Sequence, residues 1–343
     1  MGLKTFVIRR ILLMIPTLIG VTLLIFALTQ LFTPSRRAMI YVTNTKELNA
    51  IEEIIIKYHL NDPVYVQYYY WVIQVLQGNL GWSQTANMPV LQAMMQTIPA
   101  TVELVIFSIP LTILIGIWLG VKSASHRDSI IDHLTRFLAI TGYSLPSFWL
   151  GFMLISVFYA WLGWLAPFRL GYEANAFVYS KSFIRYTGMN TIDGILNGQL
   201  WISLDAIKHI ILPVIVLTVI SIALLIRVMR SSMLEALSKG YITMARAKGL
   251  SNQEVINKHA RRNALIPVIT LSGLLAAGLL TGVTITETVF NYYGVGYYAA
   301  HAAMRVDIPA VLGFSLFTGI VFVVANLIVD VTYAYIDPRI RLG

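Results

Sequence analysis

Six long stretches of the chain contain no charged side chain. They are residues 11–35, 104–121, 137–168, 210–226, 263–286 and 308–329. Crossing the hydrocarbon core of a bilayer takes about 20 apolar residues in an α-helix. The stretch at 210–226 is shorter, but Lys208, His209 and Arg227 at its ends can extend their polar groups toward the interfaces. None shows the alternation typical of barrel strands, so the pattern predicts an all-α membrane protein with six transmembrane helices.

The first apolar stretch resembles a cleaved signal peptide in one respect, because Lys4, Arg9 and Arg10 precede it. A signal peptide has an apolar core of about 7–15 residues. Residues 11–35 exceed that length. We therefore expect a retained signal anchor, which forms the first transmembrane helix.

The segments after the first and third predicted helices are long. Within the first of them, residues 48–60 are amphipathic, with Ile51, Ile54, Ile55 and Tyr58 on one helical face. This spacing predicts a short helix that lies on the bundle. No internal repeat or flexible linker divides the chain, so we expect one folding unit. Its parts are the N-terminal tail and first helix (1–33), a large external loop with the amphipathic helix (34–100), and a core of five transmembrane helices (101–343).

Composition supports a membrane protein. The chain is 57% hydrophobic and 12% charged, and its mean hydropathy is +0.72, whereas soluble domains carry about 25% charged residues. This excludes an ordinary water-soluble enzyme. Zero cysteines exclude disulfides, thiolate metal sites and a cysteine nucleophile.

The distribution of basic residues predicts the orientation. With the N-terminus inside, the cytoplasmic segments hold 16 of the 25 Lys and Arg residues in 75 positions, and the external segments hold 9 in 133. Cytoplasmic loops of membrane proteins are enriched in this way. Both termini are therefore expected in the cytoplasm. The net charge of +9 is explained by this topology and requires no nucleic acid.

The sequence lacks the common motifs of catalysis and of autonomous transport. It has no nucleotide-binding G-x-x-x-x-G-K-[ST] motif, and its histidines have no metal-ligand spacing. Asp128, Asp132 and His133 are expected to form polar surface near a helix start. Ion-coupled carriers place acidic residues near the bilayer midplane, whereas Glu103, Glu287 and Asp330 here fall at predicted helix ends. No residue is predicted to be catalytic, and an ion-coupled carrier is disfavoured.

The cytoplasmic loop 227–262 is the most informative segment. Helix-forming residues run to Lys248, and Gly249 then provides a break because it can adopt a left-handed conformation. Ser251 and Glu254 have the spacing of a capping box, which predicts a new helix from about Asn252. The small residues Ala245 and Ala247 are then expected at an exposed corner, where a partner's groove can close over the backbone. Spacing alone fits protein docking and binding to anionic lipid equally well.

Residues 241–267 of this loop read YITMARAKGLSNQEVINKHARRNALIP. This segment resembles the signature loop of ATP-binding-cassette (ABC) importer permeases, specifically of the dipeptide, oligopeptide and nickel branch. Thr243, Met244 and Ala245 stand where the general signature has E-A-A, and Gly249 takes the glycine position. Further segments are similar to the same family in the same order, namely residues 9–26, 60–83, 98–105, 287–296, 307–309, 326–333 and 337–341. One departure is Tyr293, which occupies the position of a family proline in the outer loop.

The resemblance implies a type I ABC importer permease fold in the cell membrane. It implies a non-catalytic subunit that forms half of a translocation pathway. The partners would be a homologous second permease, two ABC ATPase subunits that bind the ATP and Mg²⁺, and an external solute-binding protein; this chain itself would need no cofactor. The resemblance also implies that the loop couples to the ATPases. We expect the contacts at Thr243, Met244, Ala245, Arg246, Ala247, Lys248 and Gly249, where Arg246 and Lys248 offer charged hydrogen bonds.

Asn326, Asp330 and Glu103 are candidates either for lining the pathway or for packing within the bundle. Asn326 and Asp330 share one helix face, and they either line the pathway or pack against the bundle by pairing with Arg227 or Arg230. Glu103 is expected in the first turn of its helix, where a negative charge is favourable.

The alternatives to an importer permease are an ion-coupled secondary transporter without an ATPase and a membrane scaffold without transport.

The transported solute stays open between peptides and saccharides. The family name suggests di- or oligopeptides, but related permeases carry di- and oligosaccharides. Many aromatic residues near the outer side suit sugar rings, although an interfacial aromatic belt explains them as well. Few charges in the spans are available for the two ends of a peptide.

Overall fold

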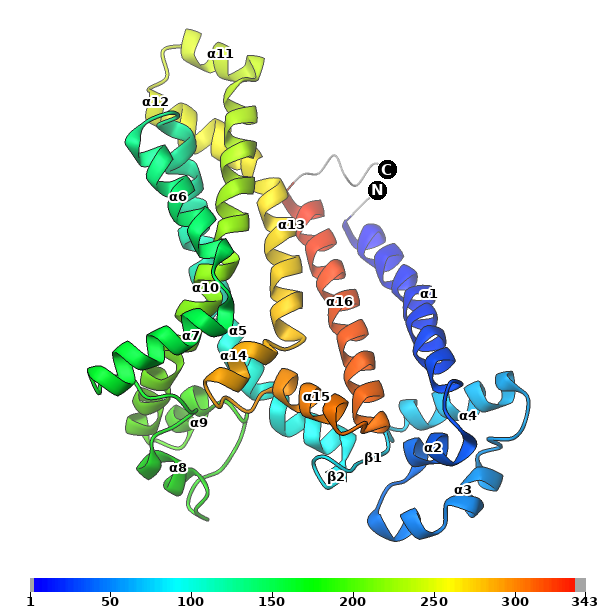
Figure 1. Ribbon diagram of the computed structural model, residues 1–343. Helices are drawn as coiled ribbons and strands as arrows, with labels where there is room; N and C mark the ends of the chain where they lie inside the picture. The colour runs from blue at the N-terminus through cyan, green and yellow to red at the C-terminus, as the bar shows by residue number, and fades with distance from the viewer. Residues whose placement is uncertain (1–2, 337–343) are drawn as a thin grey trace.

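The computed structural model describes residues 3–336 and is almost entirely helical (Figure 1). Five helical segments of this part of the chain are long and apolar enough to cross a membrane. They are α1 (Leu3–Thr29), α5 (Val90–Ser125), α10 (Leu200–Leu237), α13 (Arg261–Leu280) with the helical turns preceding it, and α16 (Ile308–Ile336). The prediction of an all-α membrane architecture is confirmed. The matched segment at 337–341 lies outside the described residues.

The third predicted span, residues 137–168, is sharply bent. It consists of α6 (Ile130–Ser144) and α7 (Ser147–Ile155), and the latter continues into a π-helical stretch, η3 (Ser156–Trp161). The two halves meet at an angle of 96°. Proline disfavours the helical conformation in the residue before it, and Leu145 before Pro146 is extended. The prediction of one continuous helix over 137–168 is therefore wrong, and the bundle has six spans only if the bent pair counts as one.

The central helix is α10, the most deeply buried of the long helices. It spans 38 residues, whereas the hydropathy pattern gave only 210–226, because charged residues end an apolar window without ending the helix. Helix α5 packs closely along it. A Cβ atom on Gly120 would lie 2.6 Å from the Cβ of Met229, and one on Gly116 would lie 2.9 Å from that of Leu225. Glycines thus allow these two helices to approach each other.

The shorter elements gather mainly at one end of the bundle, opposite helix α11 (Gly240–Ala247) (Figure 1). We call the two ends the α11 end and the α15 end. Between α1 and α5 lie α2 (Pro34–Ala38), η1 (Met39–Tyr41), η2 (Thr45–Asn49), α3 (Ile51–Lys57), α4 (Val64–Leu76) and the hairpin β1 (Trp82–Ser83) with β2 (Met88–Pro89). Before α10 lie α8 (Tyr172–Val178) and α9 (Asn190–Leu196), and between α13 and α16 lie α14 (Thr284–Val289) and α15 (Val295–Met304).

The amphipathic segment 48–60 forms a helix that is shorter than predicted. Helix α3 covers Ile51–Lys57, and its Ile54 is 6% exposed in a cluster with Leu60 and Trp71.

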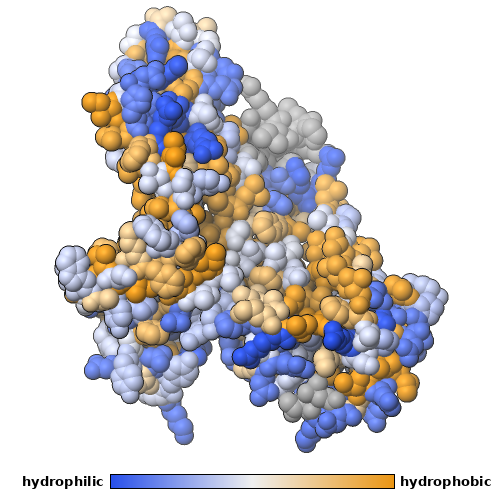
Figure 2. Space-filling view, in the orientation of Figure 1, coloured by the Kyte–Doolittle hydropathy of each residue, from blue (hydrophilic) through white to orange (hydrophobic). Residues whose placement is uncertain are grey.

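The distribution of hydrophobic side chains over the surface of the protein also fits a bilayer. Figure 2 shows apolar side chains over the middle of the visible face and hydrophilic side chains over the α11 end.

Candidate coupling loop and buried polar clusters

The loop at the α11 end is built from two helices around a glycine corner. Helix α10 ends at Leu237, and Lys239 is extended before α11 begins. The predicted continuous helix through Lys248 is therefore wrong, because the chain is interrupted between α10 and α11. Gly249 has a φ of +79°, in the left-handed region. The capping box is confirmed, because Ser251 Oγ accepts from the amide of Glu254 and Glu254 Oε2 accepts from the amide of Ser251.

The capping box begins α12 (Asn252–Glu254), which continues through a π-helical stretch, η4 (Val255–Ala260), into α13. Figure 1 shows α11 and α12 projecting beyond the other long helices. The predicted helix start near Asn252 is thus confirmed, and the loop forms a helical elbow rather than an irregular connection.

Seven residues of this elbow were predicted to contact a partner, and six of them are exposed. The exposed ones are Thr243, Met244, Arg246, Ala247, Lys248 and Gly249. Ala245 is only 5% exposed and belongs to a core cluster with Ile242, Val255 and Ala260. The expectation that Ala245 is a small residue at the exposed tip is wrong, because Ile242 and Ala245 share the inner face of α11. Its small size instead lets α11 lie close to η4.

A buried ion pair joins α6 to α10 near the same end. Arg230 donates from Nε to Asp132 Oδ1 at 2.8 Å and from Nη2 to Oδ2 at 2.7 Å. Ser123 Oγ also donates to Asp132 Oδ1, and the carboxylate is completely buried. Asp132 is therefore not polar surface, contrary to expectation. The described residues contain no group of three His, Cys, Asp or Glu side chains that could hold a metal ion.

Asp330 pairs with Arg10 at 3.0 Å and thereby joins α16 to α1. The predicted alternative, a pair with Arg227 or Arg230, is wrong. Helix α1 packs beside α16, and this neighbour could not be inferred from helix periodicity. Asn326, one turn earlier, is exposed. Asn326 and Asp330 lie on α16, which stands between α13 and α1 (Figure 1), and their predicted role in the pathway stays a prediction.

Glu103 lies at the centre of a buried polar cluster at the α15 end. It is 1% exposed and lies well inside α5, so its expected position in a first helical turn is wrong. Helix α5 begins at Val90, well before Glu103, and Pro99 lies within the helix. Arg169 donates to Glu103 Oε2 from Nη2 at 2.8 Å and from Nε at 3.1 Å, and Tyr292 Oη donates to the same oxygen at 2.7 Å. Both the amide and the hydroxyl of Thr191 donate to Oε1 at 2.8 Å.

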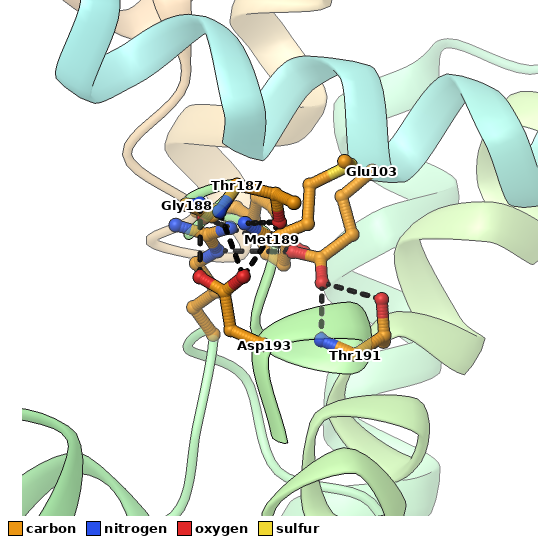
Figure 3. Close-up of polar contacts among 8 residues, drawn as sticks. Glu103, Thr187, Gly188, Met189, Thr191 and Asp193 are labelled. Atoms are coloured by element: carbon orange, nitrogen blue, oxygen red, sulfur yellow. Dashed lines mark hydrogen bonds and ion pairs between the residues drawn. The ribbon is translucent and has the colours of Figure 1, made fainter. Parts of the chain in front are cut away.

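A second carboxylate holds the turn that faces Glu103. Figure 3 shows Glu103 reaching from its helix toward Thr191, with Asp193 beside the turn at Thr187 and Gly188. Asp193 accepts from the amides of Thr187 and Gly188 at 2.8 and 2.9 Å. Arg169 Nη2 also donates to the carbonyl oxygen of Gly188 at 2.6 Å. The cluster therefore ties the segment between η3 and α10 to α5.

A third carboxylate, Glu287, organises the turn between α14 and α15. It is fully buried, and it accepts from Thr101 Oγ1 and from the amide of Tyr297, both at 2.6 Å. Burial raises the pKa of Glu287 although these hydrogen bonds act to lower it. A Cβ atom on Gly294 would overlap both Glu287 Oε1 and Thr101 Oγ1. Tyr293, at the position of the family proline, is 57% exposed and does not enter this cluster.

Sequence reasoning missed the partners of all these carboxylates. Arg169, Thr191 and Tyr292 lie 66, 88 and 189 positions from Glu103. The one available signal was an isolated arginine directly after an apolar span. Its partner could not be read from spacing.

Two family models together match nearly the whole chain. One, described as the binding-protein-dependent transport system inner membrane component, matches residues 112–342, and the corresponding N-terminal model matches residues 3–115.

Known relatives extend over the same length. The dipeptide transport system permease protein DppB of Alkalihalophilus pseudofirmus is 39% identical over 97% of this chain and 98% of its own length. DppB of Escherichia coli is 38% identical over 98% of both chains. The oligopeptide transport system permease protein AppB of Bacillus subtilis is 35% identical over 99% of this chain and 100% of its own. The chain therefore belongs to the inner membrane permeases of binding-protein-dependent transport systems, as a multi-pass ABC importer permease of the peptide family.

Proposed function

We propose that this chain forms half of the translocation pathway of an ATP-driven peptide importer. It would pair with a homologous second permease, with two ATPase subunits that bind ATP and Mg²⁺, and with an external solute-binding protein. In this arrangement the α11 end and both termini face the cytoplasm, and the α15 end faces outward. The excess of Lys and Arg in the segments assigned to the inside supports this orientation.

One observation carries the proposal, namely the exposure of six residues around a left-handed glycine on the helical elbow at the α11 end. Thr243 to Gly249 would contact the ATPases, with Arg246 and Lys248 making charge-assisted hydrogen bonds. Ile242 and Ala245 anchor the elbow to the bundle, so a force applied to its tip is passed to α10 and α13. The same exposed bases would otherwise bind anionic lipid, but lipid binding requires no left-handed corner.

We favour peptides as the solute because the relatives named above are dipeptide and oligopeptide permeases. Oligosaccharides are the alternative solute. The test is ATP hydrolysis by the complete complex with its binding protein, against a panel of dipeptides, oligopeptides and oligosaccharides. We expect stimulation by peptides. Stimulation by sugars alone would replace the proposed solute, and uptake driven by an ion gradient without ATP would replace the mechanism by secondary transport.

A further inference from the structure

A small cavity opens at the α15 end between the β1–β2 hairpin, the start of α5, and α15. Its volume is about 270 Å³. A cavity of this volume can hold a small polar molecule. It is lined by Thr85, Ala86, Thr97, Tyr293, Tyr297, Tyr298, His301 and Arg305. None of these residues belongs to the Glu103 cluster or to the elbow.

One wall of the cavity is a ladder of rings that ends in a cation. The Tyr293 and Tyr297 rings meet edge to face at 4.9 Å, and the Tyr297 and His301 rings lie 4.2 Å apart. Tyr297, His301 and Arg305 are four residues apart, so they follow one face at and just beyond α15. Arg305 is exposed. Its planar guanidinium group matches a carboxylate with two parallel hydrogen bonds.

A second part of the cavity lining carries hydroxyl groups that have no hydrogen-bond partner of acceptable geometry within the described chain. These are Thr85 Oγ1 and Tyr298 Oη, and both are buried. Tyr298 is 5% exposed, and its hydroxyl lies near that of Ser83. Both oxygens are closed to solvent, so they make this part of the lining polar without offering a ligand a direct contact.

A buried carboxylate makes this second side negative. Asp307 is 3% exposed, and it accepts from Ser83 Oγ at 2.7 Å and from the amide of Thr85 at 2.8 Å. Its donors in the described chain are uncharged hydroxyl and amide groups. The cavity therefore has a cationic end at Arg305 and a side at Thr85 and Tyr298 that is backed by a negative charge.

We propose that this cavity is a subsite for a short zwitterionic peptide, with its carboxylate on Arg305 and its ammonium group toward the side that the Asp307 carboxylate makes negative. The aromatic ladder packs against the peptide plane. Glycylglycine, the smallest dipeptide, is the probe for this cavity. This inference rests on the peptide-import function proposed above, and it assigns to this chain a contact with the solute that is separate from the binding protein. Tyr293 contributes to the ladder, which gives the residue at the family proline position a role.

Protection of an introduced cysteine from alkylation tests the subsite. The chain has no cysteine of its own, so the introduced thiol is the only thiol in this chain. Ala86→Cys places that thiol in the cavity lining and leaves the ladder and Arg305 intact. The rate of its alkylation by N-ethylmaleimide is measured in the complex of permeases and ATPases without the binding protein. Ser182→Cys, at an exposed position outside the cavity, is the matched control.

We expect glycylglycine to slow alkylation at Ala86→Cys roughly tenfold and to leave Ser182→Cys unchanged. Glycylglycinamide has the same size but no carboxylate, so it should protect much less. In the Ala86→Cys background, Arg305→Gln should remove the difference between acid and amide, and Arg305→Lys should retain part of it. A charge-assisted hydrogen bond to a carboxylate accounts for a difference of this size.

Three results would overturn the subsite: equal protection by the amide, protection by maltose, or an unchanged preference for the acid in Arg305→Gln. Absence of protection by glycylglycine at concentrations that saturate uptake by the complete transporter would do the same. If glycylglycine protects but no peptide stimulates ATP hydrolysis in the complete complex, the import function fails and the subsite stands. The converse result removes the subsite and leaves the import function intact.

Discussion

The ion pair between Arg169 and Glu103 gives the sharpest test of the packing at the α15 end. Arg169→Gln removes the cation beside a carboxylate that is 1% exposed, and it also removes a hydrogen bond to the carbonyl oxygen of Gly188. Breaking a buried pair by removing one partner costs about 3–5 kcal/mol. Here Thr191 and Tyr292 still donate to the carboxylate, so we expect the lower limit, about 3 kcal/mol. In a chain of this size that corresponds to a Tm lowered by about 5 °C.

The assay is thermal unfolding of the purified complex together with a double-mutant cycle. Glu103→Gln alone should also destabilise the protein, because it leaves the Arg169 guanidinium without its anion. The combined variant should lose less than the sum of the single losses by at least about 1 kcal/mol, which is the size of coupling found between residues in contact. Arg185→Gln is the matched control, since Arg185 is exposed in the same segment and lies over the Tyr179 ring. Its expected effect is within about 0.5 kcal/mol. Strictly additive losses in the cycle would refute the reasoning.

Three further substitutions test other parts of the structure. Asp132→Asn should lower stability by about 3 kcal/mol, because Arg230 then lacks its buried anion, whereas Asp128→Asn, at a largely exposed side chain, should change the unfolding midpoint very little. Gly294→Ala should cost more than a typical surface change, since the added methyl group overlaps the Glu287 carboxylate; a wild-type Tm would show that the turn has room. Ser251→Ala removes the helix cap and should cost about 1 kcal/mol, measured by hydrogen exchange at the amides of residues 252–255, and unchanged protection there would contradict the cap.

The hydrophobic pattern predicts the architecture because lipid contact constrains composition directly. Residues that face lipid must be apolar whatever their neighbours are, so five of the six expected spans correspond to long helices. Helix ends are predicted less well. Helix α10 continues through Lys208 and Arg227 beyond the uncharged stretch, where the hydropathy of a window no longer reports helical structure. The bend at Pro146 lies within an uncharged stretch and therefore leaves the hydropathy unchanged.

Local chemistry is also readable from the sequence, but long-range pairing is not. The capping box of Ser251 and the left-handed Gly249 depend on residues within five positions, and both are present as predicted. The partners of Asp132 and Glu103 depend on which helices become neighbours. These pairs join positions 98 and 66 residues apart, and one sequence holds no record of that proximity. The inward orientation of Ala245 likewise depends on where η4 lies.

The central claim is that the elbow at the α11 end couples this permease to ATP hydrolysis. Gly240 in α11 and Gly249 at the corner provide a matched pair of positions. Both have open space around them, but only Gly249 has a positive φ. Valine is strongly disfavoured in the left-handed region, so Gly249→Val should deform the corner while Gly240→Val leaves it intact. The decisive measurement is peptide-stimulated ATP hydrolysis by the complete, membrane-inserted complex. We predict loss of stimulation in Gly249→Val and near wild-type stimulation in Gly240→Val, and full stimulation in both variants would contradict coupling through this elbow.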